Sequence, residues 1–148
     1  MGKLVDVLTS PPKHDQVVND CVRVVDEEVD AKGGLSGFAV KAAYATVKAV
    51  KPGIIASAVT ALLPEFARKL EPFYDEWQAT APGETLERFL VARSGAVAEA
   101  LLSVTDRKAE RAESPIVRKA YDKLRPSGKK HVEEAIPRVG RVLERHLR

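Results

Sequence analysis

Several residue types are scarce in this chain, and their scarcity narrows what it can be. Cys21 is the only cysteine among 148 residues, so no disulfide within the chain is possible and nothing argues for an oxidising compartment. No apolar run approaches the ~20 residues that a transmembrane helix requires. The first residues also lack the uninterrupted apolar segment and the cleavage site of a signal peptide. We therefore expect a cytoplasmic protein without a membrane span.

Residues that commonly build active sites are also few and poorly placed. None of the three histidines, His14, His131 and His146, belongs to the Glu-x-x-His motif of metal-binding helical bundles. Nothing marks a base or an oxyanion site for Cys21, which we expect to be a small buried apolar residue. The acidic cluster at residues 26–30 is most simply an exposed helix face. The sequence predicts no metal site, no cofactor and no catalytic residue, and we do not expect an enzyme.

The apolar residues follow helical periodicity throughout. Between Pro11 and Gly33 they recur at spacings of three and four, which is typical of a helix with one core-facing side. No alternating apolar and polar stretch bounded by turn residues predicts a strand. Pro64 should start a new helix or kink the preceding one. We expect an all-α, compact bundle of about seven or eight helices, over residues 11–32, 36–50, 54–63, 65–78 and 85–104, with further helices starting at Pro115 and Pro126.

Two parts of the sequence resemble each other. The segment Val40-Lys41-Ala42-Ala43-Tyr44 returns as Val117-Arg118-Lys119-Ala120-Tyr121, and matching residues continue in the same order on both sides. Repeated patterning predicts a repeated supersecondary unit. We interpret residues 1–148 as a single domain of two tandem, pseudo-symmetric helical repeats, at about 3–79 and 85–148, with a linker at 80–84. The flanking matches are Asp26 with Asp106, Pro52 with Pro126, Pro64 with Pro137, and Glu71 with Glu144.

The whole chain, and especially the segments 32–44, 62–66 and 119–126, resembles a family of small uncharacterised bacterial proteins. This resemblance covers nearly the full length. It implies a stand-alone domain of the bacterial cytosol, and it brings no activity, cofactor, partner or functional residue with it.

The repeated pairs Lys41/Tyr44 and Arg118/Tyr121 form one candidate site. A separation of three places the base and the phenol on neighbouring positions of one helical face. If pseudo-symmetry brought the two pairs together, they could flank a pocket for an anionic group. Alternatively, each tyrosine packs in the core and its hydroxyl meets a buried partner, for which the two repeated aspartates are the natural candidates.

A second candidate site is aromatic, because half of the eight aromatic residues lie within one short segment. Such a set is typical of a core, and it also occurs in ligand cavities and dimer interfaces. We expect a core and keep an interface or a cavity as alternatives. The residues are Phe66, Phe73, Tyr74 and Trp77.

The net charge of +3 hides an asymmetry, since residues 1–105 carry a net −3 and residues 106–148 a net +6. A basic third can attract nucleic acid or another anion, although its interspersed acidic residues favour a solvated helix face. The lack of a catalytic pattern favours a non-catalytic binding or interaction module, with a protein partner or a second copy. The alternatives are a carrier of a small apolar or amphipathic ligand between the repeats, and weak nucleic-acid or anion binding. Nucleic acid is the less expected partner, because no recognisable binding motif is present.

Overall fold

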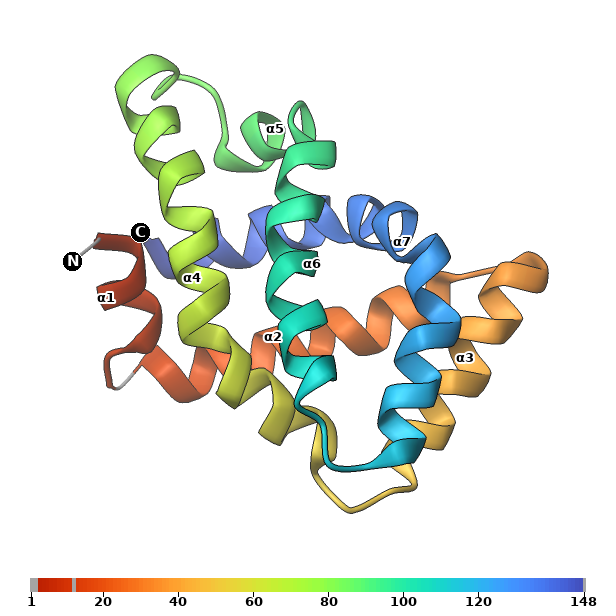
Figure 1. Cartoon of the computed structure of the whole chain (residues 1–148). Coiled ribbons are helices and arrows are strands. Elements are labelled where there is room, and N and C mark those ends of the chain that lie inside the picture. Colours follow the sequence, from red (N-terminus) through yellow and green to blue (C-terminus); the bar gives the residue numbers. More distant parts are fainter. Residues whose placement is uncertain (1–2, 12, 148) are drawn as a thin grey trace.

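Helices account for nearly all of the computed structural model, which describes residues 3–11 and 13–147 (Figure 1). This part of the chain contains no strand, so the prediction of an all-α fold is confirmed. None of its helices is both long and apolar enough to cross a membrane. The seven helices are α1 (Lys3–Thr9), α2 (Lys13–Ala31), α3 (Gly34–Lys48), α4 (Ile54–Thr80), α5 (Leu86–Val91), α6 (Ser94–Glu110) and α7 (Pro115–Leu147).

The helices form two crossing layers. Figure 1 shows α4 and α6 crossing over α2 and the second half of α7. Helix α4 contacts α2 and α6, and α7 contacts the same two helices. Helix α5 packs on α7, and α1 packs on α4. Helix α3 lies at the edge of the molecule, beside α7.

The hydrophobic core lies where the layers cross, and it holds the short helices in place. An isolated helix as short as α1 or α5 is unstable in water, so packing must stabilise both. Leu4 and Leu8 of α1 are at most 1% exposed, as are Leu86 and Leu90 of α5. The other fully buried large side chains are Phe89, Ile136, Val17 and Val97.

The two short helices also begin in the same way, against a glutamate of a longer helix. The backbone N–H groups of Leu4 and Val5 donate to the Glu71 carboxylate, at 3.1 and 3.0 Å. The N–H of Glu87 donates to Glu144 Oε1 at 2.9 Å. A carboxylate there satisfies N–H groups that lack a partner within the helix and interacts favourably with the helix dipole. Glu71 and Glu144 are matched in the predicted duplication, which stays a prediction.

The prolines do not separate helices. At Pro64 the chain continues in one helix, which excludes the new helix but not the kink that was the other expectation, and the helix start predicted at Pro126 is wrong. Helix α4 continues through Pro64 and Pro72, and α7 continues through Pro126 and Pro137. Each internal proline removes one backbone hydrogen bond and crowds the preceding turn, which bends a helix when neighbouring elements hold both halves. Figure 1 shows α7 turning sharply in its middle.

Smaller differences concern the other helix ends. The segment predicted as one helix over 85–104 divides into α5 and α6, which lets α5 pack across α7. The predicted cap at Thr85 is confirmed, since its hydroxyl accepts the Arg88 N–H at 3.1 Å. Helix α3 begins at Gly34, before the expected Ser36. Helix α2 begins at Lys13, so Pro11 precedes it, and Pro12 lies outside the described residues.

Candidate functional site

Helix α3 presents apolar residues on two opposite sides. On the inner side Val40 is 8% exposed, and Val47 is half-buried where α3 packs on its neighbours. On the outer side Leu35 is 92% exposed and Phe38 is 74% exposed. Helices that are apolar all round are normally covered all round. The outer side of α3 therefore has the composition of a covered surface while facing solvent.

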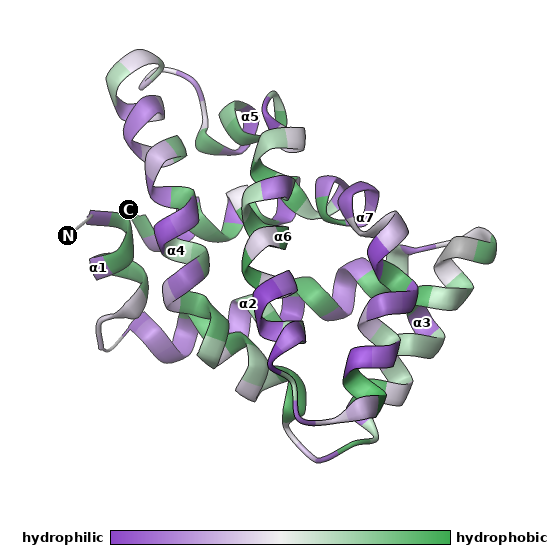
Figure 2. Cartoon of the chain, viewed as in Figure 1, coloured by the Kyte–Doolittle hydropathy of each residue, from purple (hydrophilic) through white to green (hydrophobic). Residues whose placement is uncertain are grey.

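Apart from Ala39, the exposed apolar residues from the start of α3 to its C-terminal cap at Ala49 follow a heptad pattern. Leu35 and Phe38 are followed by Ala42, Ala45 and Ala49, all exposed, at spacings of four, three and four. Such alternation keeps one narrow stripe turned towards a neighbouring helix. Figure 2 shows apolar colouring running along α3 at the edge of the molecule. We call these five residues the α3 seam.

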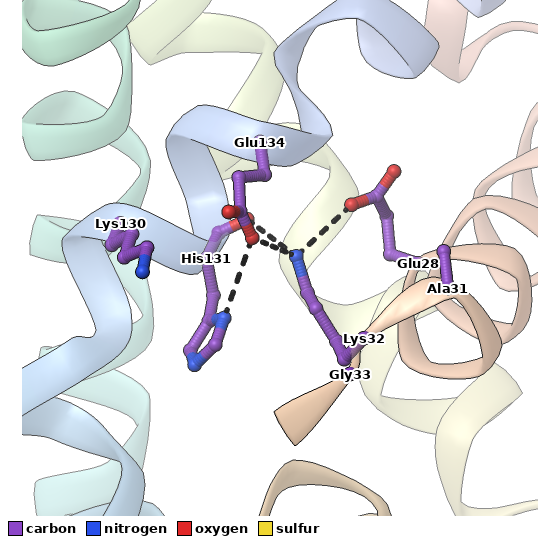
Figure 3. Close-up of a pocket in the computed structure, with 7 residues that line it drawn as sticks. All are labelled: Glu28, Ala31, Lys32, Gly33, Lys130, His131 and Glu134. Carbon is purple, nitrogen blue, oxygen red and sulfur yellow. Dashed lines mark hydrogen bonds and ion pairs between the residues drawn. The ribbon is translucent and has the colours of Figure 1, made fainter. Parts of the chain in front are cut away.

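A partly buried ion-pair network fixes the start of α3, as Figure 3 shows. The Lys32 side chain is 9% exposed, and its ammonium lies 2.6 Å from Glu134 Oε1 and 3.2 Å from Glu28 Oε1. It also donates to the carbonyl oxygen of His131 at 3.5 Å. Hydrogen bonding from Lys32 holds the pKa of Glu134 below its usual value, although burial opposes this. Because Glu134 and His131 belong to α7, this network ties the end of α2 to α7 and sets the direction in which α3 leaves.

The turn between α2 and α3 depends on glycine. Gly34 has a φ of 70°, which favours a residue without a Cβ. Gly37 lies against the Lys32 backbone, where an added Cβ would come within 2.6 Å of the Lys32 carbonyl carbon. A hollow of about 310 Å³ lies beside this turn, and its lining is mainly charged: Glu28, Ala31, Lys32, Gly33, Lys130, His131 and Glu134.

The inner side of α3 is joined to α2 through Tyr44. The Tyr44 hydroxyl donates a hydrogen bond to Asp26 Oδ1, and the Lys48 ammonium lies 5.0 Å from the centre of the Tyr44 ring. Burial raises the pKa of Tyr44, and the hydrogen bond to Asp26 raises it further. The hydroxyl is therefore protonated and engaged by a carboxylate, which does not suit it to receive an anion.

Tyr121 joins α7 to α6 in the same way. Its hydroxyl donates to Asp106 Oδ1 and lies 2.8 Å from the Thr105 hydroxyl. The Arg125 guanidinium forms two hydrogen bonds with Asp106, at 2.7 and 3.1 Å. Burial and the bond to Asp106 raise the pKa of Tyr121 to about 12, while hydrogen bonding from Arg125 lowers the pKa of Asp106 despite burial. Each repeated tyrosine thus meets the repeated aspartate on the preceding helix.

The bases predicted to accompany the tyrosines lie elsewhere. Lys41 and Arg118 are both exposed. The cation associated with each tyrosine comes four residues after it, at Lys48 and Arg125. The predicted anion pocket between the two pairs stays a prediction, which this geometry does not favour.

The two tyrosines also allow the outer sides of α3 and α7 to be compared position by position. Phe38 stands six residues before Tyr44, Ala42 stands two residues before it, and Ala45 follows it directly. The positions at the same distances from Tyr121 are Pro115, Lys119 and Asp122, all exposed. The same tyrosine–aspartate contact therefore occurs with an apolar outer side on α3 and a charged outer side on α7.

The aromatic residues of α4 mainly fill the interior. Tyr74 is 4% exposed and belongs to the core, against which Phe73 and Trp77 are packed. The Trp77 indole N–H donates to the Glu84 carbonyl oxygen at 2.7 Å. Phe66 is half-buried. The two most exposed large apolar side chains lie on α3 instead, at Leu35 and Phe38. Heptad spacing groups them with the alanines into one stripe in the sequence, but it does not tell whether that stripe is buried or exposed.

The charges of α2 and α7 neutralise one another along their contact. Arg138 pairs with Glu27 and Glu28, so the acidic cluster of α2 is in part an inter-helix contact rather than only an exposed face. Arg145 and the buried His146 lie 3.1 and 2.6 Å from Asp20 Oδ2. A second hollow of about 220 Å³ follows this contact, lined by Asp20, Arg23, Val24, Glu27, Arg138, Arg141, Val142 and Arg145.

The described residues offer little for covalent or metal chemistry. No group of three or more His, Cys, Asp or Glu side chains among them is placed to hold a metal ion. Burial and the nearby charge of Asp20 raise the pKa of Cys21 to about 11, so the thiol stays protonated and weakly nucleophilic. The arrangement is suited to binding through an apolar face.

Comparison with known proteins agrees with the breadth of the sequence resemblance. No curated protein and no solved structure matches the chain. One family profile matches residues 4–147, which is nearly the entire sequence, and it describes a family of unknown function, DUF6918. The chain therefore belongs to the DUF6918 family.

Proposed function

We propose that this chain is a non-catalytic helical interaction module that docks a helix of a partner protein on the α3 seam. The observation that carries the proposal is the exposure of Leu35 and Phe38 at the head of a heptad-spaced apolar stripe. Fully burying a side chain of this kind contributes about 1.5–3 kcal/mol. A partner helix would recover that free energy at both positions.

The local structure supports this reading because it presents α3 rigidly. The Lys32 network and the Tyr44–Asp26 hydrogen bond hold both the start and the inner side of the helix. A helix held in place before binding loses less conformational freedom when a partner arrives. The docking surface is therefore pre-formed.

The alternatives are less well supported. Both hollows are lined mainly by charged side chains, which does not favour a carrier of an apolar ligand. Several arginines of the basic third, among them Arg138, Arg141 and Arg145, face carboxylates, which does not favour nucleic acid. The proposal includes a setting in the bacterial cytoplasm, supported by the sequence resemblance and the single cysteine.

Site-specific photo-crosslinking in cells tests the proposal. A photoreactive residue at Phe38 should form a discrete adduct, and the same residue at Asp122 on the charged side of α7 should not. The cross-linked protein would then be purified, and its affinity for the wild-type chain and for Phe38→Asp measured. Losing about 2 kcal/mol of burial weakens binding roughly 30-fold. Equal adducts from both positions, or an unchanged affinity, would contradict the proposal.

A further inference from the structure

The rim of the α3 seam carries one sign of charge. Leu35, Ala42 and Ala49 occupy position a of the heptad. The g positions that precede Ala42 and Ala49 are both lysine, Lys41 and Lys48, and both are exposed. The two e positions, Ala39 and Thr46, are uncharged. Residues at e and g select the partner of a helix pair through charge.

No acidic residue lies near these lysines in the sequence. From residue 31 to residue 64 the chain contains four lysines and no aspartate or glutamate. Lys32 is engaged by Glu28 and Glu134. Lys48 lies over the Tyr44 ring but remains exposed, as do Lys41 and Lys51 along α3 and the loop that follows it. A partner helix lying on the seam would therefore meet positive charge along one edge.

We infer that the occupant of the α3 seam is an amphipathic helix with a small or apolar a/d stripe and with glutamate or aspartate facing Lys41 and Lys48. This inference rests on the proposed docking function. A second copy fits less well. Antiparallel pairing of α3 with itself would set g positions against g positions and bring lysines together, and parallel pairing would set Lys41 and Lys48 against uncharged e positions.

The size of the seam defines the partner further. A 15-residue helix is about 22 Å long, so the partner needs only two heptads. Such an interface lies below the ~1,200 Å² of standard protein complexes, and we expect a transient complex. The alanines at positions a and d require the partner helix to approach closely, which favours small residues opposite Ala42 and Ala45.

Binding of three stapled helical peptides to the purified full-length protein tests the inference by fluorescence anisotropy. The peptides share one Leu/Ala a/d stripe and carry Glu, Gln or Lys at every e and g position. The Glu peptide should bind about tenfold more tightly than the Gln peptide, and the Lys peptide should bind most weakly. Added salt should reduce the difference. The double variant Lys41→Glu/Lys48→Glu should reverse the order, whereas Lys119→Glu, a charge reversal on α7, should leave it unchanged.

The outcomes separate this inference from the proposed function. Equal binding of all three peptides, lost in Phe38→Asp, would overturn the acidic preference and leave the docking function standing. No binding of any peptide would overturn the inference. If sedimentation then showed a dimer that Phe38→Asp dissociates, the occupant would be a second copy. Flotation with phosphatidylserine vesicles that the same substitution abolishes would instead identify a lipid surface, and the proposed docking of a protein helix would also fail.

Discussion

Helix α5 lies directly against Gly140 of α7, and replacing this glycine should be costly. A Cβ at position 140 would lie 2.6 Å from the Glu87 Cα and 3.1 Å from its Cβ. Helix α5 would have to move away, because the nearest atom belongs to the backbone rather than to a flexible side chain. That movement would also strain the hydrogen bonds from Glu87 N–H to Glu144 and from Arg141 to Glu87.

Two opposing effects set the magnitude. Replacing a glycine by alanine inside a helix contributes about 1 kcal/mol of stability. Overpacking a tight contact costs typically 1–3 kcal/mol and occasionally more, and a backbone clash at 2.6 Å belongs at the upper end. We therefore expect Gly140→Ala to lower the free energy of unfolding by about 1–2 kcal/mol.

Gly128 provides the matched control on the same helix. A Cβ there would meet Leu102 Cδ2 at 3.6 Å, an ordinary van der Waals distance. Gly128→Ala should therefore raise the free energy of unfolding by about 0.5–1 kcal/mol. Urea denaturation followed by circular dichroism at 222 nm measures both variants. The reasoning is refuted if Gly140→Ala is as stable as the wild type, or if Gly128→Ala is the less stable variant.

Other predictions concern the partly buried tyrosines, Cys21 and Asp106. Tyr44→Phe and Tyr121→Phe should each lower the free energy of unfolding by about 1 kcal/mol, and unchanged urea midpoints in both would contradict this. Burial raises the pKa of Cys21 to about 11 in the folded protein. The protonated thiol therefore contributes stability at any pH below the pKa of the unfolded chain, and this contribution is lost as the pH rises towards 11. Ellman's reagent at pH 8 should accordingly label Cys21 only when denaturant is added. Asp106 has a lowered pKa, so its contribution is present above the unfolded value of about 3.9 and is lost as the pH falls through the folded value. Asp106→Asn should flatten the acid side of a plot of stability against pH, and an unaltered plot would count against the role given to Arg125.

Local patterns predicted much of the fold, because they reflect interactions within a few residues. The periodic valines of α2, the cap at Thr85 and the all-helical class belong to this group. The path of the chain past Pro64 and Pro126 was not predictable in the same way. Proline in a helix costs about 3 kcal/mol, and only packing between elements far apart in the sequence decides whether the helix ends or bends.

The candidate site was harder to predict, because burial is a property of the whole fold. Phe38 and Val40 both fit an apolar helical stripe, and nothing local distinguishes the exposed residue from the buried one. The tyrosine–aspartate partners could be named in advance because both members recur in the sequence. Predicting that the outer side of α3 is exposed would have required knowing where α7 and the other neighbours of α3 pack against it.

The tyrosine contacts decide between two explanations of the exposed apolar side of α3. If the geometry of the helix pair required such a surface, the corresponding positions of α7 would share it, yet Lys119 and Asp122 are charged and exposed there. The pair is therefore compatible with a charged outer side, and the fold does not account for Leu35 and Phe38. It follows that Phe38→Asp should change the free energy of unfolding by no more than about 0.5 kcal/mol, as surface substitutions do. A substitution that leaves the fold intact and abolishes binding would separate what α3 contributes to the fold from what it contributes to recognition.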